Sequence, residues 1–377
     1  MSAPRIFLSA GEPSGDLHGA RVAEALHRRW PDAELVGLGG DRMAAAGVRL
    51  LAHVDQLAIM GFVEVLRHLP YFIDLMRTVK RTLAELRPDL VLPIDYPGFN
   101  LRLARHAHDR AIPVLYYIAP QVWAWHRSRM SQLARNTDHL AVILPFETEL
   151  FRQAGATASF VGHPLLDQAP PGASRDEFLG PLGVDPGRPV LALFPGSRAQ
   201  EVERQLHTFV AAARAVVERM PDVQPVLAES AAVPGSTYDA VSVPRTRDGW
   251  TLLHHAHAAL VKSGTSTLQA ALAGTPLVVT YRVHPLTFFL ARRLVRVPHV
   301  GLVNLVAGER LAPELLQSEA TADRLAGALL PLLAESSAER RAALAGLARV
   351  RERLAAAGDD RSAADRVADL AADLIHA

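Results

Sequence analysis

The sequence of 377 residues contains no cysteine, which excludes disulfide bonds, thiolate metal sites and a cysteine nucleophile. It has almost no net charge, because 40 Lys and Arg residues face 39 Asp and Glu residues, so no global field attracts nucleic acid. It also lacks an apolar run long enough to cross a membrane or to act as a signal peptide. We therefore expect a cytoplasmic protein that holds anionic ligands locally and meets any lipid from its surface.

The length and composition predict two folded domains. Hydrophobic residues make up 49% of the chain and charged residues 21%, a globular composition, and 377 residues exceed the size of most single cores. The Pro- and Gly-rich stretch at residues 168–173 interrupts the pattern as a linker would. We predict a first domain over residues 1–167 and a second over residues 175–355. A last helix at about residues 360–377 could cross back to cover the first domain.

Short apolar runs alternate with segments of helical periodicity, which predicts an α/β chain of two Rossmann-like, doubly wound parallel sheets. The predicted strands are residues 6–10, 35–38, 90–94, 114–118, 139–143, 158–161, 190–194, 223–227, 240–243, 259–262 and 277–280. The predicted helices are residues 19–30, 41–46, 70–86, 101–110, 128–136, 147–154, 201–220, 249–255, 267–273 and 285–295, followed by two Ala- and Leu-rich helices after residue 320. Ligands of such sheets bind at the carboxyl ends of the strands, and two similar sheets suggest a cleft between them.

Acidic and glycine residues follow the first strand, in the sequence from Gly11 to Asp16. Ser14 and Asp16 can cap the next helix, and glycine lets a ligand approach the backbone closely. Glu12 and Asp16 favour contact with a sugar or an amine over contact with phosphate. The alternative is a capped strand-to-helix turn that binds nothing.

Asp95 directly follows the strand predicted at residues 90–94, so it lies at the carboxyl edge of the sheet and is partly shielded from water. A raised pKa there would suit a general base that deprotonates a hydroxyl group. The alternative is a helix cap or a structural bond, because Asp is common before Pro and Gly in turns.

Two tryptophans and two arginines follow a strand at residues 120–129, and they include Trp123 and Arg127. Aromatic faces pack against sugar rings and guanidinium groups hold phosphate, so the pattern fits a phosphorylated sugar. In the alternative, one tryptophan is a core residue and the arginines are solvated. His163 ends the last strand of the first half and either contacts substrate or packs against the linker.

Two turns of the second half resemble anion-binding sites, because each joins a strand to a helix and contains small residues. Gly196, Ser197 and Arg198 form the first, and Ser263, Gly264 and Thr265 form the second. Backbone N–H groups and a helix N-terminus bind anions, and Arg198 can neutralise a leaving diphosphate. The pair suits the two phosphates of a nucleotide diphosphate, whereas either turn alone could be purely structural.

Sixteen histidines raise the question of a metal site, but their clusters at residues 106–108 and 254–257 lack a metal-binding pattern such as His-Glu-x-x-His. We expect no metal and no cofactor.

The segment at residues 59–76 is apolar with basic residues nearby. It suits either a bilayer interface that accepts acyl chains or a buried core helix.

Taken together, these motifs resemble lipid-A-disaccharide synthases from end to end, through their order and spacing. The matching segments are residues 11–16, 60–65, 94–100, 122–125, 160–164, 195–198, 263–265 and 303–305. The resemblance implies a GT-B fold of two Rossmann-like domains, the first for the lipid acceptor and the second for the UDP-sugar. It implies inverting transfer of diacylglucosamine from UDP-2,3-diacylglucosamine to 2,3-diacylglucosamine 1-phosphate, which gives a β-1,6 disaccharide and UDP.

The resemblance also implies residue roles. Asp95 matches the family's base, Arg198 matches the arginine at the diphosphate, and Asn304 and Gln317 fall near the nucleotide. Similar enzymes often have Glu where this chain has Gln269, an amide that binds ribose hydroxyls without charge assistance. The family lies peripherally on the cytoplasmic face of the inner membrane, a role that the segment at residues 59–76 would serve.

Other functions fit parts of this pattern. A UDP-sugar epimerase shares the fold and the nucleotide site but needs no lipid acceptor. Another membrane-associated glycosyltransferase would differ in its acceptor, and a nucleotide-sugar or lipid-binding protein would not need Asp95. The Ala-rich C-terminal helices could bridge the domains or form a homodimer contact.

Overall fold

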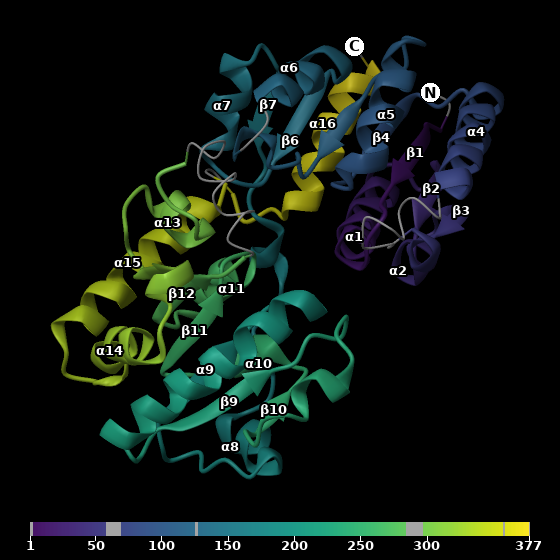
Figure 1. The fold of residues 1–377 in the computed structure, drawn as a ribbon. Coiled ribbons are helices and arrows are strands. Elements are labelled where there is room, and N and C mark those ends of the chain that lie inside the picture. The colour runs from purple at the N-terminus through teal and green to yellow at the C-terminus, as the bar shows by residue number, and fades with distance from the viewer. Residues whose placement is uncertain (1–2, 58–68, 125–126, 284–296, 357–358, 377) are drawn as a thin grey trace. The chain divides into compact units, whose positions relative to one another are not determined.

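The computed structural model describes residues 3–57, 69–124, 127–283, 297–356 and 359–376. The chain divides into two compact units, each with its own parallel sheet and hydrophobic core (Figure 1). Unit 1 comprises Met1–Asp167 and Ala356–Ala377, and unit 2 comprises Gln168–Ala355. The division falls at the start of the Pro- and Gly-rich stretch.

Unit 1 is a Rossmann-like fold of short, buried parallel strands. The strands are β1 (Arg5–Ser9), β2 (Glu34–Gly39), β3 (Arg49–His53), β4 (Leu90–Pro93), β5 (Leu115–Tyr117), β6 (His139–Val142) and β7 (Ala158–Phe160). They form two sheets, β3-β2-β1-β4 and β5-β6-β7. Isolated parallel bridges between the β4 and β5 regions link the two sheets. The central strands are continuous apolar runs because helices cover both faces of such a sheet.

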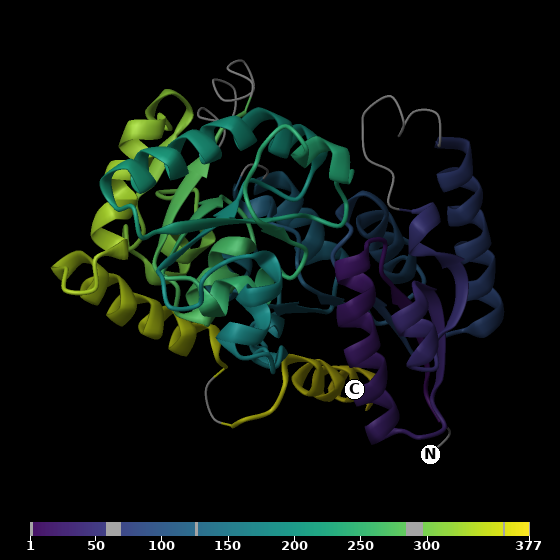
Figure 2. The ribbon, with the colours of Figure 1, turned by 90° about the horizontal axis from the view of Figure 1, so that it is seen from below.

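The helices of unit 1 include one from the far end of the sequence. They are α1 (Pro13–Arg29), α2 (Asp41–Ala45), α4 (Leu69–Leu86), α5 (Pro97–His108), α6 (Arg127–Asn136), α7 (Glu147–Gln153) and α16 (Ala363–His376). Helix α16 packs beside α1, where its Val367 is fully buried (Figure 2). Ion pairs of 2.6 Å from Arg28 to Asp365 and 2.9 Å from Arg29 to Asp369 flank this contact.

Unit 2 repeats the architecture, and its first strand is again internal. The strands are β8 (Val190–Phe194), β9 (Gln224–Ala228), β10 (Arg245–Thr246), β11 (Ala258–Lys262), β12 (Leu277–Tyr281) and β13 (Glu314–Leu316), in the parallel order β10-β9-β8-β11-β12-β13. The helices are α8 (Arg175–Leu179), α9 (Ala199–Arg219), α10 (Gly249–His255), α11 (Ser266–Ala273), α13 (Leu302–Ala307), α14 (Ala322–Leu333) and α15 (Ala338–Leu354). Strand order therefore reverses beside β8 and β11, where doubly wound folds bind ligands.

Helix α1 begins at Pro13, six residues before the predicted start at residue 19. The glycines that suggested a loop instead allow close packing of the helix. A Cβ atom on Gly15 would lie 3.2 Å from the Cβ of Ala10, and one on Gly19 would lie 2.5 Å from the Sδ of Met43. Proline suits the first helical turn because its missing N–H would have no partner there.

Further differences concern the edge strands and the C-terminal helices. The strand predicted at residues 240–243 is wrong, since the edge strand forms after Pro244 as β10. Strands β3 and β13 lie at sheet edges and were not predicted. The single helix expected between residue 320 and the last predicted helix at about residue 360 is two helices, because Ser337 caps a new helix, α15. The helix predicted at residues 285–295 lies outside the described residues, as do residues 59–68 of the apolar segment.

Candidate functional site

Asp95 occupies a strained backbone position at the carboxyl end of β4. Asp95 and Tyr96 have φ angles of 46° and 51°, in the left-handed region that non-glycine residues rarely adopt. The Asp95 N–H donates to the Tyr117 carbonyl at 3.0 Å. The Asp95 carbonyl accepts from the Tyr116 hydroxyl at 2.7 Å and from the Asn100 amide at 2.8 Å. Three hydrogen bonds therefore hold the Asp95 backbone and fix the position from which its side chain extends.

The ends of β1 and β4 interlock around this turn. A Cβ atom on Gly11 would lie 2.3 Å from the ring of Tyr96, so only glycine fits there. The Tyr96 hydroxyl donates to the Leu57 carbonyl at 3.1 Å, and the Ser9 hydroxyl donates to Asn100 at 2.6 Å. Gly11, after β1, therefore leaves the space that the Tyr96 ring occupies in the turn after β4.

Two carboxyl groups share this edge of the sheet. Burial and, to a lesser extent, the negative charge of Glu12 raise the pKa of Asp95 to about 6, against a hydrogen bond from the backbone at Tyr96. Glu12 precedes α1, and its side chain makes no capping hydrogen bond. A carboxyl group with a pKa near the working pH is suited to accept a proton from a hydroxyl group.

Trp123 is buried beside this site, in a short 3-10 turn after β5, and Glu147 at the start of α7 holds it. One Glu147 oxygen accepts from the indole N–H at 2.9 Å and the other accepts from the Leu144 N–H at 3.1 Å. Burial raises the pKa of Glu147 to about 7, although these hydrogen bonds favour its charged form. Trp123 is the core tryptophan of the alternative reading, and stacking on a sugar would require its ring to leave this position. Arg127 opens α6, and its side chain lies outside the described residues.

Asp16 lies inside α1 and is buried. Its carboxylate accepts backbone hydrogen bonds from Gly40 at 2.7 Å, Met43 at 3.0 Å and Arg42 at 3.2 Å. Asp16 therefore caps α2 rather than its own helix, and most of the acceptor capacity of its carboxylate is already used. Ser14 is exposed in the first turn of α1.

His163 follows β7 and is buried, with Nδ1 accepting from the Leu165 N–H at 3.2 Å. Burial and, to a lesser extent, the neighbouring His18 lower its pKa to about 3. Its ring is therefore neutral at physiological pH. A neutral ring of this kind contributes a hydrogen bond and no charge.

The turn at residues 196–198 leads from β8 into α9. Gly196 has a φ of 143°, and a Cβ atom there would lie 2.7 Å from the Cβ of Glu201. The Ser197 N–H donates to Glu201 at 3.1 Å, and Gln205 donates to the Pro195 carbonyl at 3.2 Å. These contacts fix the turn, while Arg198 at the start of α9 stays exposed.

The turn at residues 263–265 leads from β11 into α11. Gly264 has a φ of 151°, and the Thr267 hydroxyl donates to its carbonyl at 2.8 Å. The Ser263 hydroxyl is already bonded to the Val300 carbonyl at 2.7 Å. Thr265 is exposed, and Gln269 is half-buried on α11. The hydroxyl group at Thr265 is therefore more available to a ligand than that of Ser263.

An ion pair that the sequence analysis missed joins the two turns. Lys262 Nζ lies 2.8 Å from an oxygen of Glu201, and the two side chains are 17% and 20% exposed. Burial opposes ionisation of Glu201, yet the hydrogen bond and charge of Lys262 hold its pKa below the ordinary value. The available signal was a lysine at the end of a buried strand, directly before a turn that the sequence predicts to bind an anion.

Asn304 and Gln317 brace loops of unit 2. The buried Asn304 amide bonds to both backbone groups of Ala312 and to Glu314 at 2.8–2.9 Å. The Gln317 side chain exchanges two hydrogen bonds with the backbone of Val283, at 2.9 and 3.1 Å. Their direct contact with a nucleotide stays a prediction.

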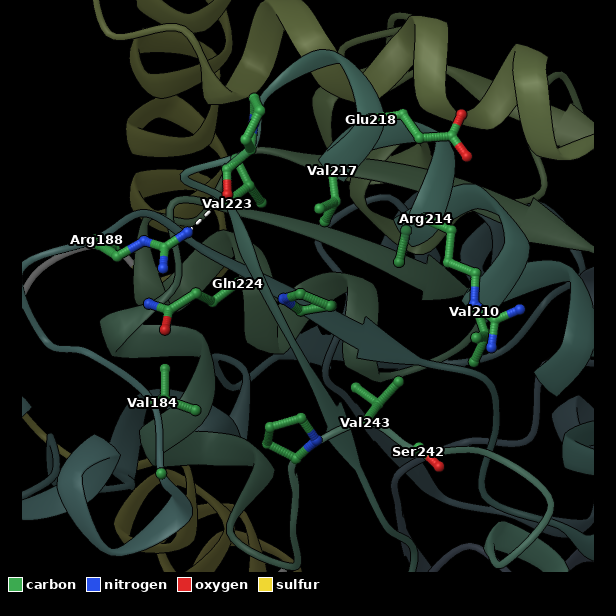
Figure 3. Close-up of a pocket in the computed structure, with 15 residues that line it drawn as sticks. Val184, Arg188, Val210, Arg214, Val217, Glu218, Val223, Gln224, Ser242 and Val243 are labelled. Atoms are coloured by element: carbon green, nitrogen blue, oxygen red, sulfur yellow. Dashed lines mark hydrogen bonds between the residues drawn. The ribbon is translucent and has the colours of Figure 1, made fainter.

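A cavity of about 520 Å³ in unit 2 (Figure 3) has none of the residues of either turn in its lining. Val210 and Val217 from the second half of α9 line it, together with Gln224 at the start of β9. Arg188 at its rim donates to the Pro221 carbonyl at 2.6 Å. Because the cavity adjoins the amino end of β9, it is not part of the candidate anion site.

Among the described residues, no three His, Asp or Glu side chains gather as metal ligands. No helix in the described ranges is long and apolar enough to cross a membrane. Helix α4 buries Leu75, Val79 and Leu83 on one face, while Leu69 and Ile73 near its start are 44% and 45% exposed. The start of α4 therefore presents apolar surface to solvent.

Solved structures establish the fold. The glycotransferase of kitacinnamycin superimposes with a TM-score of 0.67 at 18% identity, covering 100% of both chains. A structure titled putative UDP-N-acetylglucosamine 2-epimerase from Listeria monocytogenes gives 0.67 at 14% identity, covering 97% of this chain and 95% of that one. The GT-B fold predicted from the sequence is confirmed, and its neighbours include both transferases and epimerases.

Sequence relatives identify the family. A family model described as "Lipid-A-disaccharide synthetase" matches residues 6–365. Lipid-A-disaccharide synthase of Acidobacterium capsulatum is 41% identical, over 99% of this chain and 97% of the relative. The synthase of Coxiella burnetii strain Dugway is 40% identical over 100% of both chains. The chain therefore belongs to the lipid-A-disaccharide synthase family.

Proposed function

We propose that this glycosyltransferase joins UDP-2,3-diacylglucosamine to 2,3-diacylglucosamine 1-phosphate by inverting displacement, with Asp95 as the general base. Family membership assigns it to lipid A disaccharide synthesis, and the epimerase alternative is not favoured. The observation that carries the mechanism is the clamped, strained turn that holds Asp95, with its raised pKa.

In the proposed reaction, the Asp95 carboxylate accepts the proton of the acceptor 6-hydroxyl group. The oxygen attacks the anomeric carbon of the donor, forming the β-1,6 bond, while the bond from that carbon to the diphosphate breaks. UDP leaves with the electron pair, and the positive charge of Arg198 neutralises it. Since attack and departure occur on opposite faces, the anomeric centre inverts.

Unit 1 would bind the acceptor and unit 2 the UDP-sugar. The proposed acceptor residues are Glu12, Ser14, Asp16, Trp123, Arg127 and His163, of which Glu12 and Ser14 are accessible in this arrangement. For the diphosphate we propose the turns at residues 196–198 and 263–265, and for the ribose Gln269. Exposed Arg198 and Thr265 support this assignment because both stand at helix starts.

The start of α4 is the proposed membrane contact, on the cytoplasmic face of the inner membrane. Leu69 and Ile73 would enter the interface, and the exposed Arg77, Lys80 and Arg81 would meet anionic headgroups. Flotation with vesicles of phosphatidylglycerol and phosphatidylethanolamine tests this. Replacing Leu69 and Ile73 by Ser should lower binding, whereas Leu344→Ser, at the exposed leucine of α15, should not. Equal binding of all three proteins would contradict the assignment.

A turnover assay tests the reaction itself. The protein, in detergent with excess chelator, is incubated with both lipid substrates, and UDP and disaccharide are followed by mass spectrometry. Equal amounts of both products are expected. UDP without disaccharide would indicate hydrolysis or a different acceptor, and product formed only after metal is restored would contradict the metal-free mechanism.

A further inference from the structure

Lys262 is an unusual residue in this chain. The sequence contains only two lysines, Lys80 and Lys262, among its 40 basic residues. Lys80 is exposed on α4, whereas Lys262 ends the buried strand β11 and is only 17% exposed. A charged ammonium group is costly to bury unless it has partners, so its surroundings indicate what it is for.

The ammonium group stands between the two anion-binding turns. It lies 3.9 Å from the position that a Cβ atom on Gly264 would take, which places it at the turn of residues 263–265. It bonds Glu201 at 2.8 Å, and the other Glu201 oxygen accepts from the Ser197 N–H in the turn of residues 196–198. The ring of Tyr281 lies 5.4 Å away as a further neighbour.

The Glu201 carboxylate is thus bound by the groups that bind phosphate oxygens, namely a lysine and a backbone N–H beside a helix start. An ammonium group has three donors, and Glu201 takes one of them. The compact, flexible lysine suits a position from which it can reach a second acceptor without losing the first, where a planar guanidinium would need a wider space.

We propose that Lys262 is a further diphosphate-binding residue, positioned by Glu201, that selects the diphosphate of the donor over a monophosphate. The inference deepens the proposed function, because it requires that unit 2 binds UDP. Lys262 donates to a diphosphate oxygen while it keeps its hydrogen bond to Glu201. It also adds a second positive charge to that of Arg198 as the glycosidic bond of the donor breaks.

Calorimetric titration with UDP, UMP and uridine tests the proposal on the full chain. Lys262→Met should weaken binding of UDP by about tenfold or more, because a charge-assisted hydrogen bond is lost. The affinity for UMP should fall less than the affinity for UDP, and the affinity for uridine should stay unchanged. Lys262→Arg should recover part of the loss. Similar losses for all three ligands would mean that Lys262 only supports the fold.

A double variant keeps the test decisive if Lys262→Met alone distorts the turns by leaving Glu201 unpaired. Glu201→Gln combined with Lys262→Met removes both charges and should still bind UDP more weakly than Glu201→Gln alone. Equal UDP affinity of these two variants would overturn the proposal. Failure of the folded wild-type chain to bind UDP would instead refute the proposed function of unit 2.

Acetylation provides an independent readout because the chain has so few lysines. Acetic anhydride treatment followed by peptide mass spectrometry measures modification of Lys262, with Lys80 as the internal control. UDP should protect Lys262 and leave Lys80 unchanged, and uridine should protect neither. Equal modification of Lys262 with and without saturating UDP would contradict direct contact.

Discussion

The two units share a strand order but differ in chemistry at the carboxyl ends of their central strands. In unit 1 these ends carry the carboxyl groups of Glu12 and Asp95, and the strained backbone belongs to Asp95 and Tyr96, which are not glycines. In unit 2 they carry the cations Arg198 and Lys262, and the positive φ angles in the two turns belong to the glycines Gly196 and Gly264. One topology thus carries carboxyl groups suited to proton transfer in one unit and cations suited to an anionic leaving group in the other.

The largest expected effect lies in unit 1. Asp95→Asn should lower kcat by about 10²- to 10⁴-fold, because the amide cannot accept the hydroxyl proton. UDP affinity, measured by calorimetry, should stay unchanged if unit 1 supplies the base and unit 2 binds UDP, as proposed. Asp109→Asn, at an exposed position after α5, is the matched control. Normal turnover of Asp95→Asn would mean that Asp95 is not the base and that unit 1 does not differ from unit 2 in the way proposed.

The next effect lies in unit 2. Gly196→Ala should weaken UDP binding by about ten- to a hundredfold, because a side chain at this φ costs about 1–3 kcal/mol and meets Glu201. Gly235→Ala, where a Cβ atom meets nothing within 4 Å, should bind UDP normally. Unchanged binding by Gly196→Ala would show that the ligand does not need this turn in its present form.

Glu147 offers a pH-dependent test in unit 1. Its folded pKa of about 7 lies above its ordinary value of 4.5, so its stabilising contribution is full below pH 4.5 and is lost as the pH rises through 7. The unfolding free energy of the wild type should fall relative to Glu147→Gln, by at most about 1.4 kcal/mol per pH unit in this window. Urea unfolding between pH 5 and 7.5 measures it. Glu149→Gln, at an exposed position on the same helix, should show a constant difference from the wild type.

The smallest effect concerns the pair of carboxyl groups in unit 1. Because the charge of Glu12 raises the pKa of Asp95, Glu12→Gln should shift the acidic limb of the kcat/KM profile, near pH 6, downward by less than about one unit. The exposed Glu24→Gln on α1 should leave it in place. An upward shift or none would mean that the limb reports another group.

The sequence predicts the fold well where its signal is local. Apolar strands buried on both faces, such as β8, show their bounds directly, whereas edge strands such as β10 and β13 do not need an apolar run. The start of α1 was misplaced because Gly15 and Gly19 provide room for Ala10 and Met43, contacts that the sequence does not show.

The site was predictable to the level of its turns but not of every side chain. The position of Asp95 follows from its strand alone. The partners of Asp16 and Trp123, which are Gly40 and Glu147, lie more than twenty residues away in the sequence. Lys262 and Glu201 are 61 residues apart, so only folding reveals their pairing.

Helix α16 also affects the order in which the chain can fold during synthesis. It belongs to the core of unit 1, yet the ribosome makes it after all of unit 2. Unit 2 can therefore complete its core while unit 1 still exposes the apolar surface that Val367 and its neighbours will cover. Premature termination between residue 355 and the start of α16 would release a chain with a finished unit 2 and an unfinished unit 1, the species that chaperones and proteases would have to handle.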